Sequence, residues 1–138
     1  MASGRSDFTT DEVTRVAEFR AALRQFMRTS ERISRRCGLT PQRYLLLLMI
    51  KGSPDGSESS TVTELAERLQ LAQSTVTELV RRAEEAGLLE RERSENDARV
   101  AHLRLSAEGE RRLRESFTSL EQERQDLREA FEHLDQAG

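Results

Sequence analysis

Apolar residues recur at steps of three and four between Thr10 and Arg36, and arginines follow the opposite side at steps of four. The apolar positions are Val16, Phe19, Leu23, Phe26 and Ile33, and Ser30 completes the steps between the last two. This spacing predicts one long helix, with Asp11 and Glu12 in the first turn, where acidic side chains favour the helix dipole. The apolar seam is narrow, so the helix needs a partner to bury it.

The second predicted helix differs from the first because it is apolar on all sides. Gly38 occupies the usual stop position after the first helix, Thr40 can cap the next one, and Pro41 fits its first position. The run from Tyr44 to Ile50 predicts a central helix that is buried all round. Residues 52–61, GSPDGSESST, are expected to form a polar loop.

Two short amphipathic helices are predicted next, over 63–69 and from about 72 to 85, and they match the packing pattern of a helix-turn-helix. Ala66 supplies a small residue where the two backbones cross. Apolar side chains suit the buried faces at Leu65, Leu69, Leu71, Val76 and Leu79. The second helix keeps a mostly polar outer face, formed by Ala72, Gln73, Ser74, Thr77, Glu78 and Arg81. This face can approach base edges or phosphates in a major groove, but a solvated surface of an ordinary helical pair has the same pattern.

The periodicity then changes from helical to alternating, which predicts a β-hairpin. Residues 88–93 and 100–105 form the two predicted strands around a turn-rich tip. From this tip Arg93 and Arg99 can reach phosphates or the minor groove, and Asp97 can hold the Arg99 guanidinium by a charge-assisted bond. The alternative for the tip is a solvated ion pair of little energetic value. A hairpin directly after a helix-turn-helix predicts a winged helix.

A last helix is predicted from Ser106 onward. Its apolar residues follow a heptad seam, which Arg124 interrupts at one position: Leu113, Phe117, Leu120, Leu127, Phe131 and Leu134. The predicted fold class is therefore mainly α with a small β-hairpin wing, a winged helix-turn-helix. Residues 1–9 are polar and small, and we expect them to form a flexible N-terminal arm.

Length and composition limit the function classes. A chain of 138 residues is one domain or little more, and it contains no apolar run long enough to span a bilayer. The N-terminus lacks the apolar region of a secretory signal, so we expect a cytoplasmic protein without contact to a membrane. One cysteine, Cys37, and two histidines, His102 and His133, predict neither a disulfide nor a metal site. There is no Gly-rich phosphate loop and no paired-carboxylate motif, so neither a cofactor nor an enzyme is expected.

From about Asp11 to Leu134 the sequence resembles the MarR family of winged-helix transcription regulators. The resemblance rests on Leu39-Thr40-Pro41-Gln42-Arg43-Tyr44 and on the block TVTELAERLQLAQSTVTELVRRAEEAGLLERERSENDARVAHLRLSAEGERRL. Within that block, the family's most specific features are the wing motif of Asp97 and Arg99, the strand end Leu103–Ser106, and Glu108-Gly109. Each feature is weak alone, but their order and spacing are specific.

The resemblance implies a homodimeric transcriptional repressor that binds an inverted repeat in double-stranded DNA. It implies a single domain over 10–138, in which 10–36 and 107–138 are dimerisation helices and 40–106 is the DNA-binding lobe. The implied DNA contacts are Gln73, Ser74, Thr75, Thr77, Arg81, Arg82, Arg93, Asp97 and Arg99. The implied dimer interface contains Val16, Phe19, Leu23, Leu113, Phe117, Leu120, Leu127, Phe131 and Leu134. Many family members release DNA when a small aromatic or phenolic effector binds between the dimer helices and the lobe.

Two features depart from the family pattern. Glu78 lies on the outer face of the predicted recognition helix, and residues 62–106 carry more acidic than basic side chains. These departures favour a second hypothesis, in which the winged helix is a protein–protein interaction module that does not bind DNA. Cys37 lies near Arg35 and Arg36, which can activate a thiol, but a packed helix-end residue is the simpler interpretation.

Overall fold

The computed structural model of the chain describes residues 9–93 and 99–135, and within them it has six helices and one antiparallel hairpin. The elements are α1 (Thr10–Arg36), α2 (Pro41–Lys51), α3 (Val62–Leu69), α4 (Gln73–Glu85), β1 (Leu89–Arg93), β2 (Ala101–Leu105), α5 (Ala107–Ser119) and α6 (Glu121–Leu134). The hairpin tip at 94–98, which contains Asp97, lies outside the described residues. The prediction of a mainly helical chain with a small hairpin is confirmed.

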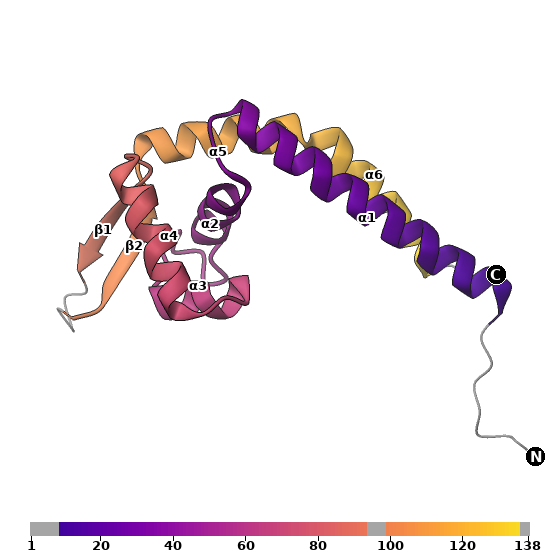
Figure 1. Cartoon of the computed structure of the whole chain (residues 1–138), viewed down its shortest axis with the longest axis horizontal. Helices are drawn as coiled ribbons and strands as arrows, with labels where there is room; N and C mark the ends of the chain where they lie inside the picture. The colour runs from indigo at the N-terminus through magenta and orange to yellow at the C-terminus, as the bar shows by residue number, and fades with distance from the viewer. Residues whose placement is uncertain (1–8, 94–98, 136–138) are drawn as a thin grey trace, which may run out of the picture.

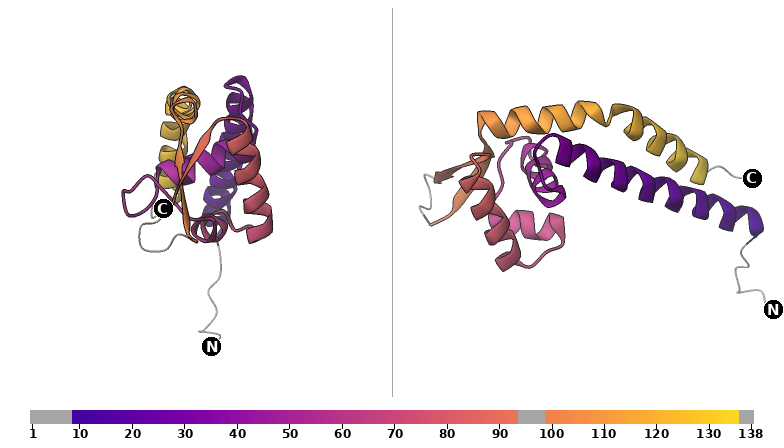
Figure 2. Two further views of the ribbon diagram at one scale, coloured as in Figure 1. Left: turned by 90° about the vertical axis from the view of Figure 1, so that its left-hand side faces the viewer. Right: turned by 45° about the horizontal axis from the view of Figure 1, so that its top comes forward.

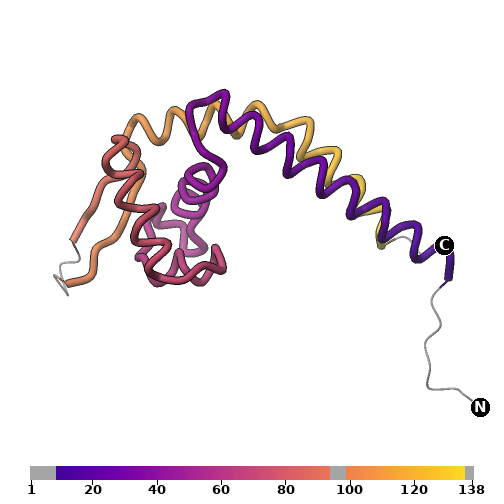
Figure 3. Tube along the Cα trace, in the orientation of Figure 1, coloured from indigo at the N-terminus to yellow at the C-terminus, as the bar shows by residue number. Residues whose placement is uncertain are grey.

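The elements divide into a lobe and an arm (Figure 1). Helices α2, α3 and α4 and the β1–β2 hairpin form the lobe, whereas α1 and α6 lie side by side and extend away from it. Helix α5 crosses the lobe and connects the hairpin to α6, as the two further views in Figure 2 show. In the trace of Figure 3, α1 runs from the far end of the arm toward the lobe and α6 runs back. In this arrangement α3, α4 and the hairpin lie on the side of the lobe that faces away from the arm.

Capping side chains set the starts of α1, α2, α3 and α5; the sequence predicts the cap at Thr40, but it assigns Thr9 to the N-terminal arm. Thr9 and Glu12 form a capping box, in which the Glu12 amide donates to Thr9 Oγ1 at 3.1 Å and the Thr9 amide donates to Glu12 Oε2 at 3.0 Å. Thr40 caps α2, with Pro41 at the first helical position. Thr61 caps α3 and forms a capping box with Glu64. Each cap satisfies amides that have no partner within the helix.

Helix α2 passes through the centre of the lobe, and side chains from the other elements cover it. Its Leu46, Leu47 and Ile50 are fully buried. They belong to one core with Leu65 of α3, Val76 and Val80 of α4, and Leu103 of β2. The prediction that α2 is buried all round is wrong at Leu45, which is 42% exposed. Leu45 lines a small open pocket with Met27 and Glu31 of α1, so this side of α2 is only partly covered.

The predicted last helix is two helices, and the break at Leu120 has a physical cause. The Arg124 guanidinium lies 3.7 Å from the centre of the Phe117 ring and donates to the Phe117 carbonyl at 2.6 Å. The Leu120 amide donates to the same carbonyl at 3.2 Å, which tightens the turn. Arg124, which interrupts the heptad seam, therefore stabilises a change of direction that lets α6 follow α1. Leu120 itself is buried at the joint.

The polar loop at 52–61 contains a contact that the sequence does not predict. Ser60 and Leu103 exchange two backbone hydrogen bonds, at 3.1 and 2.8 Å, so that Ser60 adds a single bridge to the outer edge of β2. Ser60 is only 2% exposed. Its backbone is thus satisfied by a strand that lies far away in the sequence, and loop composition carries no signal for this.

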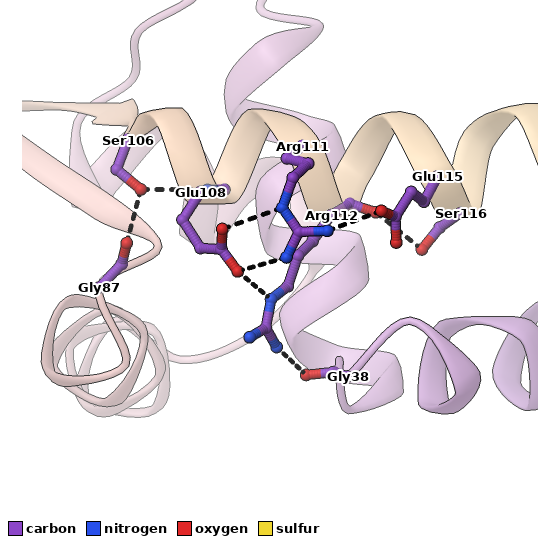
Figure 4. Close-up of polar contacts among 9 residues, drawn as sticks. Gly38, Gly87, Ser106, Glu108, Arg111, Arg112, Glu115 and Ser116 are labelled. Carbon is purple, nitrogen blue, oxygen red and sulfur yellow. Dashed lines mark hydrogen bonds and ion pairs between the residues drawn. The ribbon is translucent and has the colours of Figure 1, made fainter.

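Helix α5 starts against the end of α4 and the start of β1, as Figure 4 shows for the Ser106 and Gly87 side of this junction. Ser106 Oγ donates to the Gly87 carbonyl at 2.6 Å and accepts from the Gly109 amide at 3.0 Å. The Ser106 amide donates to the Leu88 carbonyl at 2.9 Å. Gly109 is buried, and a Cβ atom there would collide with the Leu88 carbonyl oxygen. Only glycine permits this approach of α5 to the hairpin.

We therefore expect Gly109→Ala to destabilise the protein by about 2 kcal/mol, because backbone must shift to accommodate the methyl group. At an open helical position the same substitution stabilises by about 1 kcal/mol. The sign of the change in the urea unfolding midpoint, measured at one protein concentration, separates the two effects. A midpoint equal to or higher than that of the parent would contradict the close approach.

Candidate nucleic-acid interface

Helices α3 and α4 form the predicted helix-turn-helix. Gln70 ends α3 in the left-handed region, with φ of 58°, and the Leu71 amide donates to the Ala66 carbonyl at 3.1 Å. Ala66 is 7% exposed and Leu65 is fully buried. A larger side chain than alanine would separate the two helices at their crossing, so the sequence interpretation of Ala66 agrees with its position.

Two contacts that sequence reasoning did not find fix this motif in place. The Arg68 guanidinium donates to the Met49 carbonyl at 2.8 Å and to the Gly52 carbonyl at 3.3 Å, at the end of α2. These bonds satisfy carbonyls that have no partner within α2. The Gln73 side-chain amide donates to Thr63 Oγ1 at 3.2 Å and connects the first turns of α3 and α4. Hydrogen bonds from side chain to distant backbone have no periodic signature, so pattern analysis could not identify Arg68.

The outer face of α4 carries short polar side chains toward solvent. Ser74, Thr75 and Thr77 are exposed, and so is Gln73 despite its bond to Thr63. On the inner side, Val76, Val80 and Ala83 are buried against the core. The structure therefore brings these four predicted contact residues together on one accessible surface at the start of α4.

Further along the same face, acidic and basic side chains pair closely. Glu78 accepts from Arg81 Nε at 3.0 Å and from Arg81 NH2 at 2.5 Å, and its Oε2 also accepts from Arg82 Nε at 3.0 Å. Arg81 NH1 donates in addition to Glu85. Hydrogen bonds from Arg81 and then Arg82 lower the pKa of Glu78 to about 2. Both predicted DNA-contacting arginines of α4 are thus engaged by carboxylates, and the spacing of three and four residues is the sequence signal that could have predicted these pairs.

The hairpin is held at a defined position beside α4. Five residue pairs align β1 with β2, from Leu89 opposite Leu105 to Arg93 opposite Ala101. The Arg91 guanidinium forms two hydrogen bonds with Glu84 of α4, at 2.8 and 3.0 Å. Figure 2 shows the hairpin and α4 next to each other in both views. At its outer end the hairpin exposes Arg93 and Arg99.

The arm exposes part of the apolar seam that the sequence assigns to a dimer interface. Val16 and Phe131 are 51% and 60% exposed, although Phe131 makes an edge-on contact with Phe19, with ring centroids 5.9 Å apart. Phe117 is exposed as well, and Leu23, Leu127 and Leu134 are half-buried. Two other residues of the predicted dimer interface, Leu113 and Leu120, are buried in the protomer's own core and are not presented on its surface.

A cavity of about 350 Å³ lies between α2 and α5. Leu48, Leu113 and Phe117 contribute apolar walls, and Lys51 and Arg114 contribute cationic groups. Lys51 Nζ forms ion pairs with Glu110 at 2.7 Å and with Glu58 at 2.9 Å. The hydrogen bonds that Lys51 donates to Glu110 and then to Glu58 raise the pKa of Lys51. The cavity thus combines an apolar wall with a charged rim.

The described part of the chain offers little for other classes of site. No helix among residues 9–93 and 99–135 is long and apolar enough to cross a membrane. Within the same residues, no group of three or more His, Cys, Asp and Glu side chains is placed to hold a metal ion. Cys37 is half-buried and packs against the core, as the simpler interpretation of this residue expects.

Comparison with known proteins agrees with this geometry. Residues 38–100 match the MarR family model. The chain is 28% identical over 127 residues to the uncharacterized HTH-type transcriptional regulator YsmB of Bacillus subtilis, a match that covers 89% of this chain and 84% of the relative.

Solved structures show the same fold. AbsC, a MarR family transcriptional regulator from Streptomyces coelicolor, superposes with a TM-score of 0.69 at 22% identity, over 89% of this chain and 84% of that one. A mutant MarR from E. coli, complexed with operator DNA, superposes with a TM-score of 0.65 at 19% identity, over 88% and 85%. Over residues 38–100 the sequence is thus similar to the MarR family model, and the chain has the winged helix-turn-helix fold of these MarR family structures.

Proposed function

We propose that this protein is a homodimeric repressor that binds an inverted-repeat operator in double-stranded DNA. The observation that carries the proposal is the exposed polar face at the start of α4, held beside a hairpin whose outer end presents arginines. An α-helix fits the major groove, where Ser, Thr and Gln side chains can bond to base edges. Wing arginines suit the phosphates and the minor groove. The E. coli relative complexed with operator DNA supports this assignment.

In this proposal Gln73, Ser74, Thr75, Thr77, Arg81 and Arg82 contact DNA from α4, and Arg93, Asp97 and Arg99 contact it from the wing. Arg81 and Arg82 can reach phosphates while they stay bonded to Glu78, because each guanidinium has five N–H donors and these contacts use only some of them. Because the lobe carries excess acidic charge, we expect modest affinity that falls strongly with salt.

The arm is proposed to form the dimer, and residues 40–106 the DNA-binding lobe. A helix pair that exposes Val16, Met27 and Phe131 has apolar area to bury, and a second copy of the arm supplies a matching surface. The two-fold axis of such a dimer would place the two α4 helices about one helical turn of DNA apart, which is the spacing that an inverted repeat requires.

The cavity between α2 and α5 is the proposed effector site, and a small aromatic or phenolic compound is the proposed ligand. Leu48, Leu113 and Phe117 suit an aromatic ring, and Arg114 suits an anionic or phenolic oxygen, whereas Lys51 is already paired with Glu58 and Glu110. Because the cavity lies where α5 crosses α2, a ligand that fits only one position of α5 would change the distance between the two recognition helices. The ligand can release DNA only if it binds one position of α5 more tightly than the other.

The experiment that tests the proposed function is selection of bound duplexes from a random DNA pool by the full chain at about 100 mM salt, where exposed charges are screened beyond about 10 Å. We expect a two-fold symmetric motif whose half-sites lie about 10 bp apart. If a folded dimer enriches no duplex, the DNA-binding proposal fails, and an interaction module that binds another protein becomes the better hypothesis.

Arg99→Ala should weaken operator binding about tenfold and reduce the slope of affinity against salt by about two, one phosphate contact per protomer. If Arg99 reads the width of the minor groove, preference for A·T pairs beside the half-sites falls too. The matched control is Arg128→Ala, which removes the same charge from exposed α6, far from the lobe. Fluorescence anisotropy at several salt concentrations measures both quantities. Equal losses in the two variants would contradict a specific role for the wing.

Val16→Asp should raise the dissociation constant of the dimer at least tenfold, because two unpaired carboxylates would be buried at the interface. Val16 is 51% exposed in the protomer, so the fold tolerates the change. Thr14→Asp is the control, since Thr14 lies about 200° around the same helix from Val16. Sedimentation equilibrium measures both variants, and a dimer unaffected by Val16→Asp would show that the seam is not the interface.

A further inference from the structure

We propose, on the basis of the proposed function, that Glu78 determines base specificity by accepting a hydrogen bond from the exocyclic amino group of a cytosine in the major groove. One such contact would occur in each half-site of the operator. Every other predicted contact from α4 is neutral or cationic, so a carboxylate at this position is the feature of the recognition helix that differs most from its surroundings.

Glu78 occupies a position from which a side chain can reach a base. It lies in the second turn of α4, one turn beyond Ser74, and its side chain is 45% exposed. Val76 and Val80 on either side of it point into the core, which fixes the face that α4 presents. The side chains of a recognition helix that contact bases come from its N-terminal part.

The two arginines hold the carboxylate in place without saturating it. Glu78 Oε2 accepts from Arg81 NH2 and Arg82 Nε, whereas Oε1 accepts only from Arg81 Nε among the described residues. A carboxylate can accept about four hydrogen bonds in total. Oε1 can therefore accept one further hydrogen bond. The bidentate contact with Arg81 restricts the rotamers of Glu78, and so the direction from which Oε1 can accept this bond.

Charge does not prevent this contact. An isolated carboxylate would be repelled by the phosphates, but Glu78 has two guanidiniums within hydrogen-bond distance. With Glu85, which also pairs with Arg81, the cluster contains two carboxylates and two guanidiniums and is neutral as a whole. Their hydrogen bonds also lower the pKa of Glu78 to about 2, so that at neutral pH the group is ionised and can only accept.

An acceptor-only group distinguishes the four bases by their major-groove edges. Guanine presents two acceptors there, and thymine presents an acceptor and a methyl group. Adenine presents a donor beside the N7 acceptor, which repels a carboxylate. Cytosine presents its amino donor with no adjacent acceptor of its own, so it is the base that Glu78 fits best.

The test is selection of bound duplexes from a random pool by the parent and by Glu78→Gln, followed by competition between single-base variants of the enriched site. We expect the parent to prefer cytosine about tenfold at one position of each half-site. The glutamine amide both donates and accepts, as the adenine edge requires, so Glu78→Gln should shift this position toward adenine and leave the others unchanged.

Glu85→Gln is the matched control. Glu85 also pairs with Arg81, but it lies about 10 Å further along the helix axis, so its loss removes the same charge away from the bases. It should alter overall affinity without altering the preference at any position. A parent that enriches a site whose base preferences are identical in Glu78→Gln would overturn this inference alone. A parent that enriches no duplex would instead overturn the proposed function on which the inference rests.

Discussion

The junction between the end of α4, the start of β1 and the start of α5 constrains the rest of the structure. Ser106 bonds to the Gly87 and Leu88 carbonyls, and Gly109 allows α5 to lie directly on the hairpin backbone. This contact sets the angle at which α5 leaves the lobe. The angle in turn sets the direction of the arm, since α6 continues from α5. The orientation of α4 relative to the arm therefore depends on a few backbone contacts.

Helix α5 makes two further contacts, one with Gly38 just before α2 and one with Lys51 at the end of α2. These contacts restrict the movement of α5 relative to the lobe. Arg112 donates to the Gly38 carbonyl at 2.9 Å and to Glu108 at 2.7 Å, and Figure 4 shows both contacts on one side of the helix. Lys51 connects α2 to Glu110. A displacement of α5 at the cavity would change the Lys51–Glu110 and Arg112–Gly38 contacts, so we expect it to affect α2 and the segment that precedes it.

Residues that act through periodicity or local capping were predictable, and those that act through distant contacts were not. The sequence predicts the start of α1, the cap at Thr40, the helix-turn-helix crossing at Ala66 and the hairpin, because each follows from neighbours within a few positions. It predicts one helix where Arg124 and Phe117 create two, and it does not anticipate that Arg68 bonds to α2. Such contacts depend on which surfaces meet, and spacing along the chain does not encode that.

An acidic winged-helix lobe has a consequence for how it can select DNA. Attraction to phosphates is independent of sequence and supplies most of the affinity for random duplexes. In this lobe that attraction is reduced, because the arginines of α4 are already paired with Glu78 and Glu85. What counts in a genome is the ratio of specific to non-specific affinity. A lower background raises this ratio, provided that contacts to base edges supply the difference. A carboxylate that both weakens phosphate binding and reads a base would serve these two requirements with one side chain.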